Sequence, residues 1–335
     1  MISIGRRQLV LLAATVSSLA LAASVGAAGP ALPVAANGHP VSVLATGVPT
    51  PTAFAFADST IFAGSGPAQP GGGPGGLFVL AGGRATKLRN SPRFVFGLVW
   101  HSGSLYVSTG RTIVALRGWN GRSFAAQRTI YASRQHAFPG FNGLAFGPDG
   151  RLYAGLALNE DLYDHSKDPF ALSQAVVSMT ATGKDLRIVA SGLRQPFQLR
   201  FPKGSPYPYV TVLGQDYGPD PNPPDEIVVA KSGQNYGFPT CTWHDPTVCT
   251  GFDQPLILLP AHASPMGISS IGATLYVALY TGIANSGPEV VTIPVAGGAP
   301  TPLLTGFGAH LIALGIHAGI IYVGDVSGTI YRVAA

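Results

Sequence analysis

One sequence pattern recurs along the chain: an apolar strand, a short turn rich in Gly, Asp or Ser, and a second strand that begins with an apolar and aromatic pair. The copy "FNGLAFGPDGRLYAG", residues 141–155, shows it clearly, because "GPDG" separates two apolar runs and carries turn chemistry. Six copies have the anchors Ile61, Leu105, Leu152, Tyr209, Leu275 and Ile321. Most steps between anchors are about 45 residues, the length of one four-stranded propeller blade. The sequence therefore predicts an all-β chain folded as a six-bladed β-propeller.

The two ends of the repeating region indicate how the ring closes. The strand-like segment "VSVLATG", residues 41–47, precedes the first copy, and "GTIYRVAA" follows the last. Because an unpaired edge strand invites aggregation, we expect these two segments to pair within one blade. No stretch after the N-terminal segment shows the sustained apolar period and caps of a helix. The predicted propeller spans residues 41–335.

The N-terminus has the pattern of a targeting segment. Residues 1–28 combine Arg6 and Arg7, an apolar stretch and small residues before a cleavage site near Ala27 or Ala28. This pattern predicts a signal peptide, followed by a linker over residues 29–40. A retained membrane anchor is the alternative. We expect an extracytoplasmic protein with no stable membrane span after cleavage, and the arginine pair leaves the export route open.

The charge distribution argues against nucleic acid as a partner. Only 10% of the 335 residues are charged, and 18 basic side chains face 15 acidic ones once Arg6 and Arg7 are set aside. These basic residues form no cluster that could follow a phosphate backbone. We therefore expect no nucleic-acid partner. The sequence does not indicate the oligomeric state.

Cys241 and Cys249 are the only cysteines of the sequence, and they lie close together in "PTCTWHDPTVCTG". In an exported chain, two such cysteines predict a disulfide. A zinc site that includes His244 is the alternative, although the stretch offers no obvious fourth ligand.

From about residue 143 onward the chain resembles the soluble PQQ-dependent sugar dehydrogenases, the glucose/sorbosone dehydrogenase family. The matching pieces, in order, are "GLAFGPDGRLYAG", "ASGLRQPFQLRF", "PPDEIVVAKSGQNYGFPTC", "PAHASPMGI", "LYVALYTG", "EVVTIPVAGG" and "GTIYRV". The resemblance implies a six-bladed propeller with PQQ held over the axial mouth by calcium. It also implies a sugar substrate whose C1 hydroxyl gives its proton to a histidine while hydride passes to the quinone.

The resemblance assigns roles to several residues. Arg194 matches the arginine of the family's "GLRNP" motif, which holds the cofactor and supports catalysis, and Gln195 stands in place of the asparagine. Two pairs correspond to the family's calcium-binding segment, and His262 and Tyr280 stand where the family lines its substrate pocket; the calcium pairs are Gly218 with Pro219, and Asp225 with Glu226.

Two departures bear on activity. The family's catalytic histidine corresponds to Pro139, which cannot accept a proton, and the nearest candidate, His136, lies three residues earlier. The family also binds the three PQQ carboxylates with Lys and Arg of its later blades. After Lys231 this chain has a single basic residue of these types, Arg332, in a final strand that we expect to face outward.

We therefore predict an exported propeller that binds a small polar or carbohydrate ligand at the axial mouth and lacks the family's catalytic base. Three alternatives stay open: an active PQQ-dependent sugar dehydrogenase with an unrecognised base, a metal-dependent lactonase or lyase, and a non-catalytic interaction propeller. The fold alone does not separate them. Whether the protein is an enzyme is thus not decided by the sequence.

Overall fold

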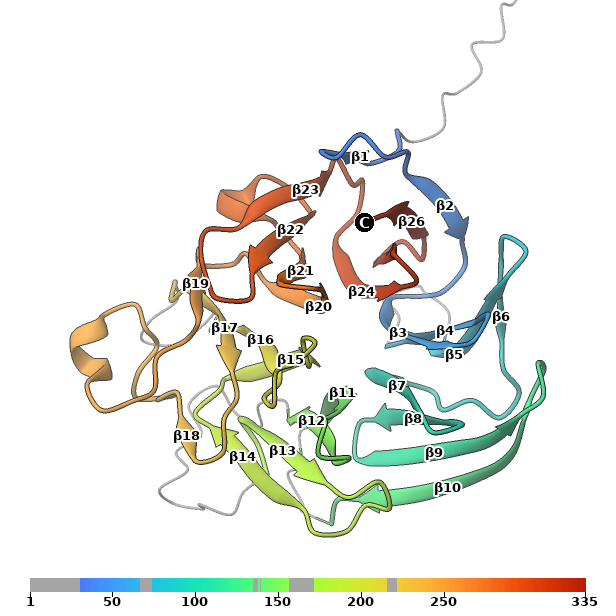
Figure 1. The fold of residues 1–335 in the computed structure, drawn as a ribbon, viewed down its shortest axis with the longest axis horizontal. Helices are drawn as coiled ribbons and strands as arrows, with labels where there is room; N and C mark the ends of the chain where they lie inside the picture. Colours follow the sequence, from blue (N-terminus) through green and yellow to red (C-terminus); the bar gives the residue numbers. More distant parts are fainter. Residues whose placement is uncertain (1–30, 67–73, 135–137, 139, 157–171, 216–221) are drawn as a thin grey trace, which may run out of the picture. The chain divides into compact units, whose positions relative to one another are not determined.

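The computed structural model describes residues 31–66, 74–134, 138, 140–156, 172–215 and 222–335. The described residues from 32 to 335 form six sheets, antiparallel apart from one short parallel pair, arranged as blades around a central axis, which confirms the predicted all-β, six-bladed propeller (Figure 1). None of the helices in these described ranges is long and apolar enough to span a membrane.

Each blade has four main strands, ordered from the axis outward. The inner strands of blades 1 to 6 are β3 (Pro51–Ala57), β7 (Gly97–His101), β11 (Phe141–Phe146), β15 (Gln195–Arg200), β20 (Pro265–Ile271) and β24 (Leu311–His317). The second strands are β4 (Thr60–Ser65), β8 (Ser104–Thr109), β12 (Leu152–Leu156), β16 (Tyr209–Leu213), β21 (Thr274–Leu279) and β25 (Ile320–Asp325).

The outer half of the blades completes the sheets. The third strands are β5 (Gly76–Ala81), β9 (Thr112–Trp119), β13 (Ala175–Met179), β17 (Asp225–Val229), β22 (Glu289–Pro294) and β26 (Ile330–Ala334). The fourth strands are β6 (Arg84–Lys87), β10 (Phe124–Ala132), β14 (Arg187–Ser191), β19 (Ile257–Leu259), β23 (Thr301–Thr305) and β2 (Ser42–Ala45). Two short strands are added at the rim, β1 (Val34–Ala35) beside β23 and β18 (Gln234–Asn235) beside β14.

The ring closes through the N-terminal strand. β2 pairs with β26 antiparallel, with Ser42 opposite Arg332, and so supplies the fourth strand of blade 6. This confirms the pairing predicted for residues 41–47. β1, which lies in the stretch expected as linker, extends the sheet of blade 5 by pairing with β23.

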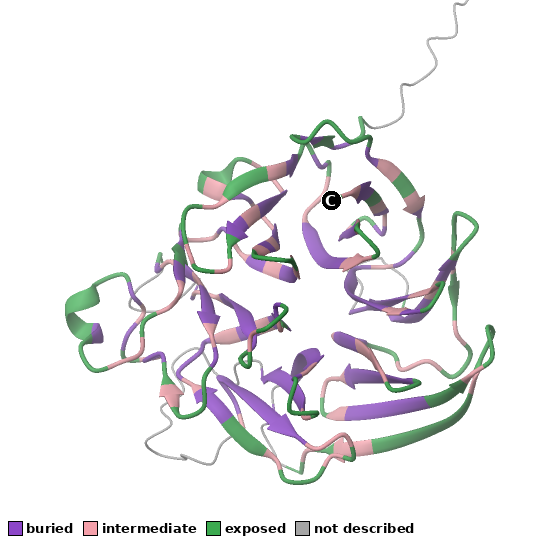
Figure 2. Cartoon of the chain, in the orientation of Figure 1, coloured by how far each residue is buried: buried purple, intermediate pink, exposed green. Residues whose placement is uncertain are grey.

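The core consists of apolar layers between neighbouring blades. Because successive side chains of a strand point to opposite faces, Leu152, Ala154 and Leu156 of β12 pack against blade 2, whereas Tyr153 packs toward blade 4. The same alternation in the other blades leaves the inner strands buried and most of the outer strands exposed (Figure 2). The mostly apolar strand sequences follow from this burial on both faces.

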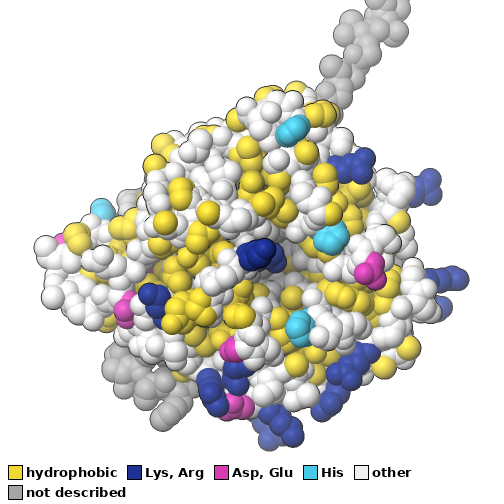
Figure 3. Space-filling model, viewed as in Figure 1, with side chains coloured by type: hydrophobic (Ala, Val, Ile, Leu, Met, Phe, Trp, Pro, Cys, Tyr) yellow, Lys and Arg dark blue, Asp and Glu magenta, His cyan; other side chains and the backbone are white. Residues whose placement is uncertain are grey.

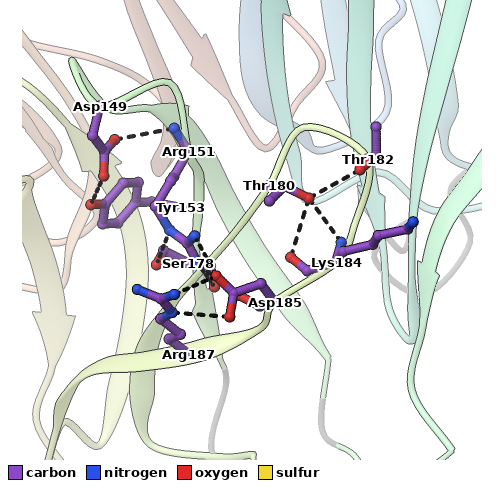
Figure 4. Close-up of polar contacts among 9 residues, drawn as sticks. All are labelled: Asp149, Arg151, Tyr153, Ser178, Thr180, Thr182, Lys184, Asp185 and Arg187. Atoms are coloured by element: carbon purple, nitrogen blue, oxygen red, sulfur yellow. Dashed lines mark hydrogen bonds and ion pairs between the residues drawn. The ribbon is translucent and has the colours of Figure 1, made fainter.

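The recurring turn of blade 3 is held by its own polar residues (Figure 4). Tyr153 donates from its hydroxyl to Asp149 at 2.8 Å, and Arg151 contacts Ser178 and Asp185, with Nη1 of Arg151 3.0 Å from the Asp185 carboxylate. Burial, and then the neighbouring Asp149, raise the pKa of Tyr153 to about 12. These contacts join two hairpins of blade 3, so this copy of the recurring pattern has a structural role.

The segment between β18 and β19 contains the predicted disulfide. Cys241 and Cys249 are bonded, with their Cα atoms 5.0 Å apart, and Cys249 ends the short 3-10 helix η1 (Pro246–Cys249). Both cysteines are buried with Trp243, whose indole N–H donates to the carbonyl of Tyr236 at 3.0 Å. The disulfide therefore closes a short loop within this segment, and Trp243 connects that loop to Tyr236. A second short 3-10 helix, η2 (Ile283–Asn285), follows β21.

A polar belt crosses the middle of the channel. In five of the six blades, the pairing between the inner strand and the second strand has a register shift near the start of the inner strand. Such a shift takes a backbone carbonyl out of the ladder, and that group then needs another donor. Neighbouring blades supply these donors: Ser108 Oγ donates to Asn142 O at 2.6 Å, Asn142 Nδ2 donates to Pro196 O at 2.8 Å, and Thr211 Oγ1 donates to Met266 O at 2.7 Å.

Gln198 of blade 4 reaches across the axis to two other blades. Its side-chain nitrogen donates to Thr52 O of blade 1 at 3.2 Å and to Phe96 O, beside blade 2, at 3.0 Å. We call the end of the channel where the inner strands begin the upper mouth, and the end where they finish the lower mouth. Gln198 stands between the two.

Candidate functional site

The described residues among those that the sequence singled out lie at the upper mouth, at the ends of strands in blades 4 and 5. Arg194 directly precedes β15, after a turn in which Gly192 has a φ of +67° and Leu193 is fully buried. The Arg194 side chain is itself buried, and its Nη1 donates to the carbonyl of Gly214, just beyond β16. Its guanidinium thus braces the start of β15 against the end of the neighbouring strand.

Gln195 opens β15 opposite Leu213 and is half-buried. Arg194 and Gln195 therefore both lie at the upper mouth, where β15 begins.

Asp225, the first residue of β17, is committed to the backbone. Its Oδ1 accepts from Gly214 N at 2.6 Å and its Oδ2 accepts from Ser264 N at 2.6 Å. Since Ser264 directly precedes β20, the carboxylate ties blade 4 to blade 5. Both oxygens are in use, so the geometry gives Asp225 a structural role at this mouth.

Glu226, the next residue, lies on the opposite face of β17. Its Oε2 is buried and accepts no hydrogen bond. Burial, and then the charge of Asp225, raise the pKa of Glu226 to about 8. A buried carboxylate with an oxygen free of hydrogen bonds is costly in its charged form, and a cation is one group that offsets this cost. Glu226 therefore offers a buried carboxylate oxygen that a cation could satisfy.

His262 and Tyr280 lie at the same end of the channel, on the loops that flank β20 and β21. The imidazole Nε2 of His262 is 3.0 Å from Asn222 Oδ1, and the carbonyl of His262 accepts from Thr281. Tyr280 stacks on His310, with ring centroids 4.0 Å apart and planes 7° from parallel, and Nδ1 of His310 is 2.8 Å from the carbonyl of Tyr280.

His310 is a residue of this site that sequence reasoning missed. It directly precedes β24, which is the position that Ser264 occupies before β20. A comparison of the residues just before each inner strand would have found it. Together with His262 and Tyr280 it presents two imidazoles and a phenol beside the upper mouth.

Several predicted positions lie outside the described residues: Gly218, Pro219, Pro139 and His136, as well as the signal peptide. Within the described ranges no group of three or more His, Cys, Asp or Glu side chains is placed to hold a metal ion. Arg332 is exposed on β26 and donates to Ser42 Oγ at 3.3 Å, which confirms that it faces away from the channel.

No family model matches this sequence, and no curated protein matches it either. Solved structures do resemble its fold. The PQQ-bound aldose sugar dehydrogenase of Streptomyces coelicolor has a TM-score of 0.69 at 18% identity, over 90% of this chain and 99% of that one. The apo form of the soluble aldose sugar dehydrogenase from Escherichia coli has a TM-score of 0.71 at 18% identity, over 88% and 99%.

The calcium structure of an AA12 carbohydrate-active enzyme from Trichoderma reesei has a TM-score of 0.74 at 16% identity, over 90% of this chain and 96% of that one. At such identities the likeness establishes the fold. The fold implied by the sequence resemblance is thus confirmed: it is a propeller of the type found in sugar dehydrogenases.

Proposed function

We propose that this protein is an exported propeller that binds a small polar ligand, of the carbohydrate type, at the upper mouth, and that PQQ-dependent sugar oxidation is absent or very weak. The fold shared with sugar dehydrogenases supports the ligand class. His262, Tyr280 and His310 support the place, because a few polar groups on an aromatic surface are typical of small-molecule sites. The disulfide supports export.

One observation carries the proposal of weak oxidation: the residues present do not fit PQQ. Residues 232–335, all of them described, contain a single Lys or Arg, and that residue, Arg332, lies on an outward face. Arg194, from an earlier blade, is bonded to Gly214 O. Burying the three carboxylates of PQQ without cationic partners would cost several kcal/mol for each. Pro139 at the position of the base adds to this, since a positioned base contributes about 10²- to 10⁴-fold in rate.

The calcium part of the resemblance is different, because the buried oxygen of Glu226 suits a cation. A calcium ion bound there would stabilise the charged carboxylate and would not by itself supply a redox reaction. Cation binding and sugar oxidation can therefore be separated by experiment.

The test is calorimetry on the purified mature protein with PQQ and calcium, followed by dye-linked turnover of glucose and other aldoses. We expect that PQQ does not bind tightly. We also expect turnover far below the order of 10 per second that is typical of enzymes. Turnover at that rate would refute the proposal and would require His136 or another group as the base.

Ligand binding is tested separately by calorimetry with a panel of mono- and disaccharides. Tyr280→Ala should abolish binding of any sugar that the wild type binds. The matched change Tyr207→Ala, in the hairpin between β15 and β16 on the side of the lower mouth, should leave sugar binding unchanged. If Tyr280→Ala binds as the wild type does, the ligand site lies elsewhere.

A further inference from the structure

The lower mouth of the channel opens into a cavity of about 450 Å³. Its walls come from all six inner strands, and Gln198 lines it from inside the channel. This volume is within the range of small-molecule sites. The sequence motifs and the proposed function concern the upper mouth, so this cavity has no role in either.

The histidine and arginine side chains that line the cavity come from alternate blades. β7, β15 and β24 contribute His101, Arg200 and His317, the last residue of each strand, whereas β3 and β11 contribute apolar residues and β20 contributes Ile268 and Ser269. Since β7, β15 and β24 alternate around the ring, these three side chains approach the axis from three directions.

The two imidazoles have fixed ring planes. His101 stacks on Phe146, with centroids 3.8 Å apart and planes 13° from parallel, and His317 stacks on Phe56, with centroids 4.9 Å apart and planes 5° from parallel. Stacking occupies the ring faces and leaves the nitrogen-bearing edges for other contacts. Among the described residues neither imidazole has a hydrogen-bond partner.

Arg200 is the third member of the set and lies across the channel from β3. Among the described residues it has neither a hydrogen-bond partner nor an ion pair, and no Asp or Glu of this part of the chain lines the cavity. Water still reaches the side chain, but the surrounding walls displace part of its hydration and lower the pKa of Arg200. On the face shown in Figure 3, a basic side chain lies at the centre with histidines beside it.

We propose that the lower mouth is a binding site for a small polycarboxylate, held by Arg200, His101 and His317. A planar guanidinium binds a carboxylate through two parallel hydrogen bonds. The two histidines, on other blades, would contact further carboxylates of the same molecule, which a single-carboxylate anion could not supply. The belt around Gln198 separates this site from the upper mouth, so the inference does not depend on the function proposed there.

The probe is citrate, titrated by calorimetry into the full mature protein in EDTA, with sodium chloride adjusted to constant ionic strength. Acetate tests the need for several carboxylates, and inorganic phosphate tests a phosphate ligand. We expect citrate to bind at least tenfold more tightly than either. Equal binding of acetate, or tighter binding of phosphate, would overturn the assignment of a polycarboxylate.

The variants test the three residues. Arg200→Gln should weaken citrate binding tenfold or more, because hydrogen bonds to charged groups are the stronger ones, whereas Arg200→Lys should lose less since it keeps the charge. His101→Phe and His317→Phe keep a stacked ring and remove the N–H groups, and each should weaken binding severalfold.

The matched control is Arg128→Gln on the exposed face of β10, which should bind citrate as the wild type does. Melting curves without ligand identify any variant that fails to fold, and Arg200→Lys serves if Arg200→Gln is such a variant. No citrate binding by the wild type, or unchanged binding by folded Arg200 variants, would overturn the proposal.

Discussion

Gln198 should contribute to stability out of proportion to its place on the channel wall, because it joins three blades. Its amide nitrogen satisfies two backbone carbonyls, those of Thr52 and Phe96, that lie on other blades. A Cβ on Gly143 would come within 2.4 Å of the Gln198 side-chain oxygen, so the amide is enclosed on that side as well. Gln198→Met keeps the length of the side chain and removes both donors.

The expected loss follows from the two carbonyls left behind. Leaving a buried polar group without a partner costs about 1–3 kcal/mol, so Gln198→Met should lower the free energy of unfolding by roughly 2–4 kcal/mol. Urea denaturation followed by fluorescence measures this as a lower midpoint at an unchanged slope. Gln198→Glu should lose more at neutral pH, because a carboxylate would face two carbonyl oxygens.

The control is Gln127→Met on the exposed part of β10, which should change stability by less than about 0.5 kcal/mol. If Gln198→Met is no more destabilising than this control, the idea that the belt holds the ring together across the axis is refuted.

Three further predictions concern other parts of the molecule. Folding raises the pKa of Glu226 from 4.5 to about 8, so the folded state holds this proton more tightly and the stability that this group contributes is lost as the pH rises between those values. In EDTA, Glu226→Gln should therefore raise the free energy of unfolding at pH 7 by up to about 3 kcal/mol and change it little at pH 4. Equal effects at both pH values would contradict this. Replacing both Cys241 and Cys249 by Ser should cost about 2–3 kcal/mol in the chain-entropy model, measured by denaturation against the wild type, and an unchanged midpoint would argue against that role. A chain that begins at residue 47 lacks β1 and β2 and leaves the edge of β26 unpaired; it should melt at a lower temperature or aggregate in light scattering, and an unchanged melting curve would show that β2 is dispensable.

The fold could be predicted from the sequence because its unit is short and repeated. Turn residues at a spacing of about 45 residues define hairpins independently of one another, and each hairpin needs a neighbour on both faces to bury its apolar side chains. Pairing of residues 41–47 with the final strand followed from the same reasoning about edges, and it is confirmed by the register of Ser42 opposite Arg332. The disulfide followed from the short separation of two cysteines in a chain whose N-terminal pattern predicts a signal peptide.

The roles of individual site residues were harder to predict, because a motif gives the type of a residue and not the partners of its atoms. Asp225 and Glu226 are neighbours in one matched motif, yet one carboxylate accepts two backbone N–H groups and the other has a buried oxygen without a partner. The pleat of β17 sends the two side chains to opposite faces, and this separates their environments. Sequence similarity alone treats them as a pair.

The lower mouth was missed for another reason: its residues belong to no motif, and only the fold brings them together. Arg200 lies opposite Tyr209, whereas His101 and His317 lie one position further along their strands, opposite Ser104 and Ile320, so an alignment of the repeats does not pair them. A position at the mouth of a channel is under weaker packing constraints than the core, so an apolar residue would fold equally well there. Three polar residues on alternate strands, with no partners of their own among the described residues, are therefore better explained by a ligand than by the needs of the fold.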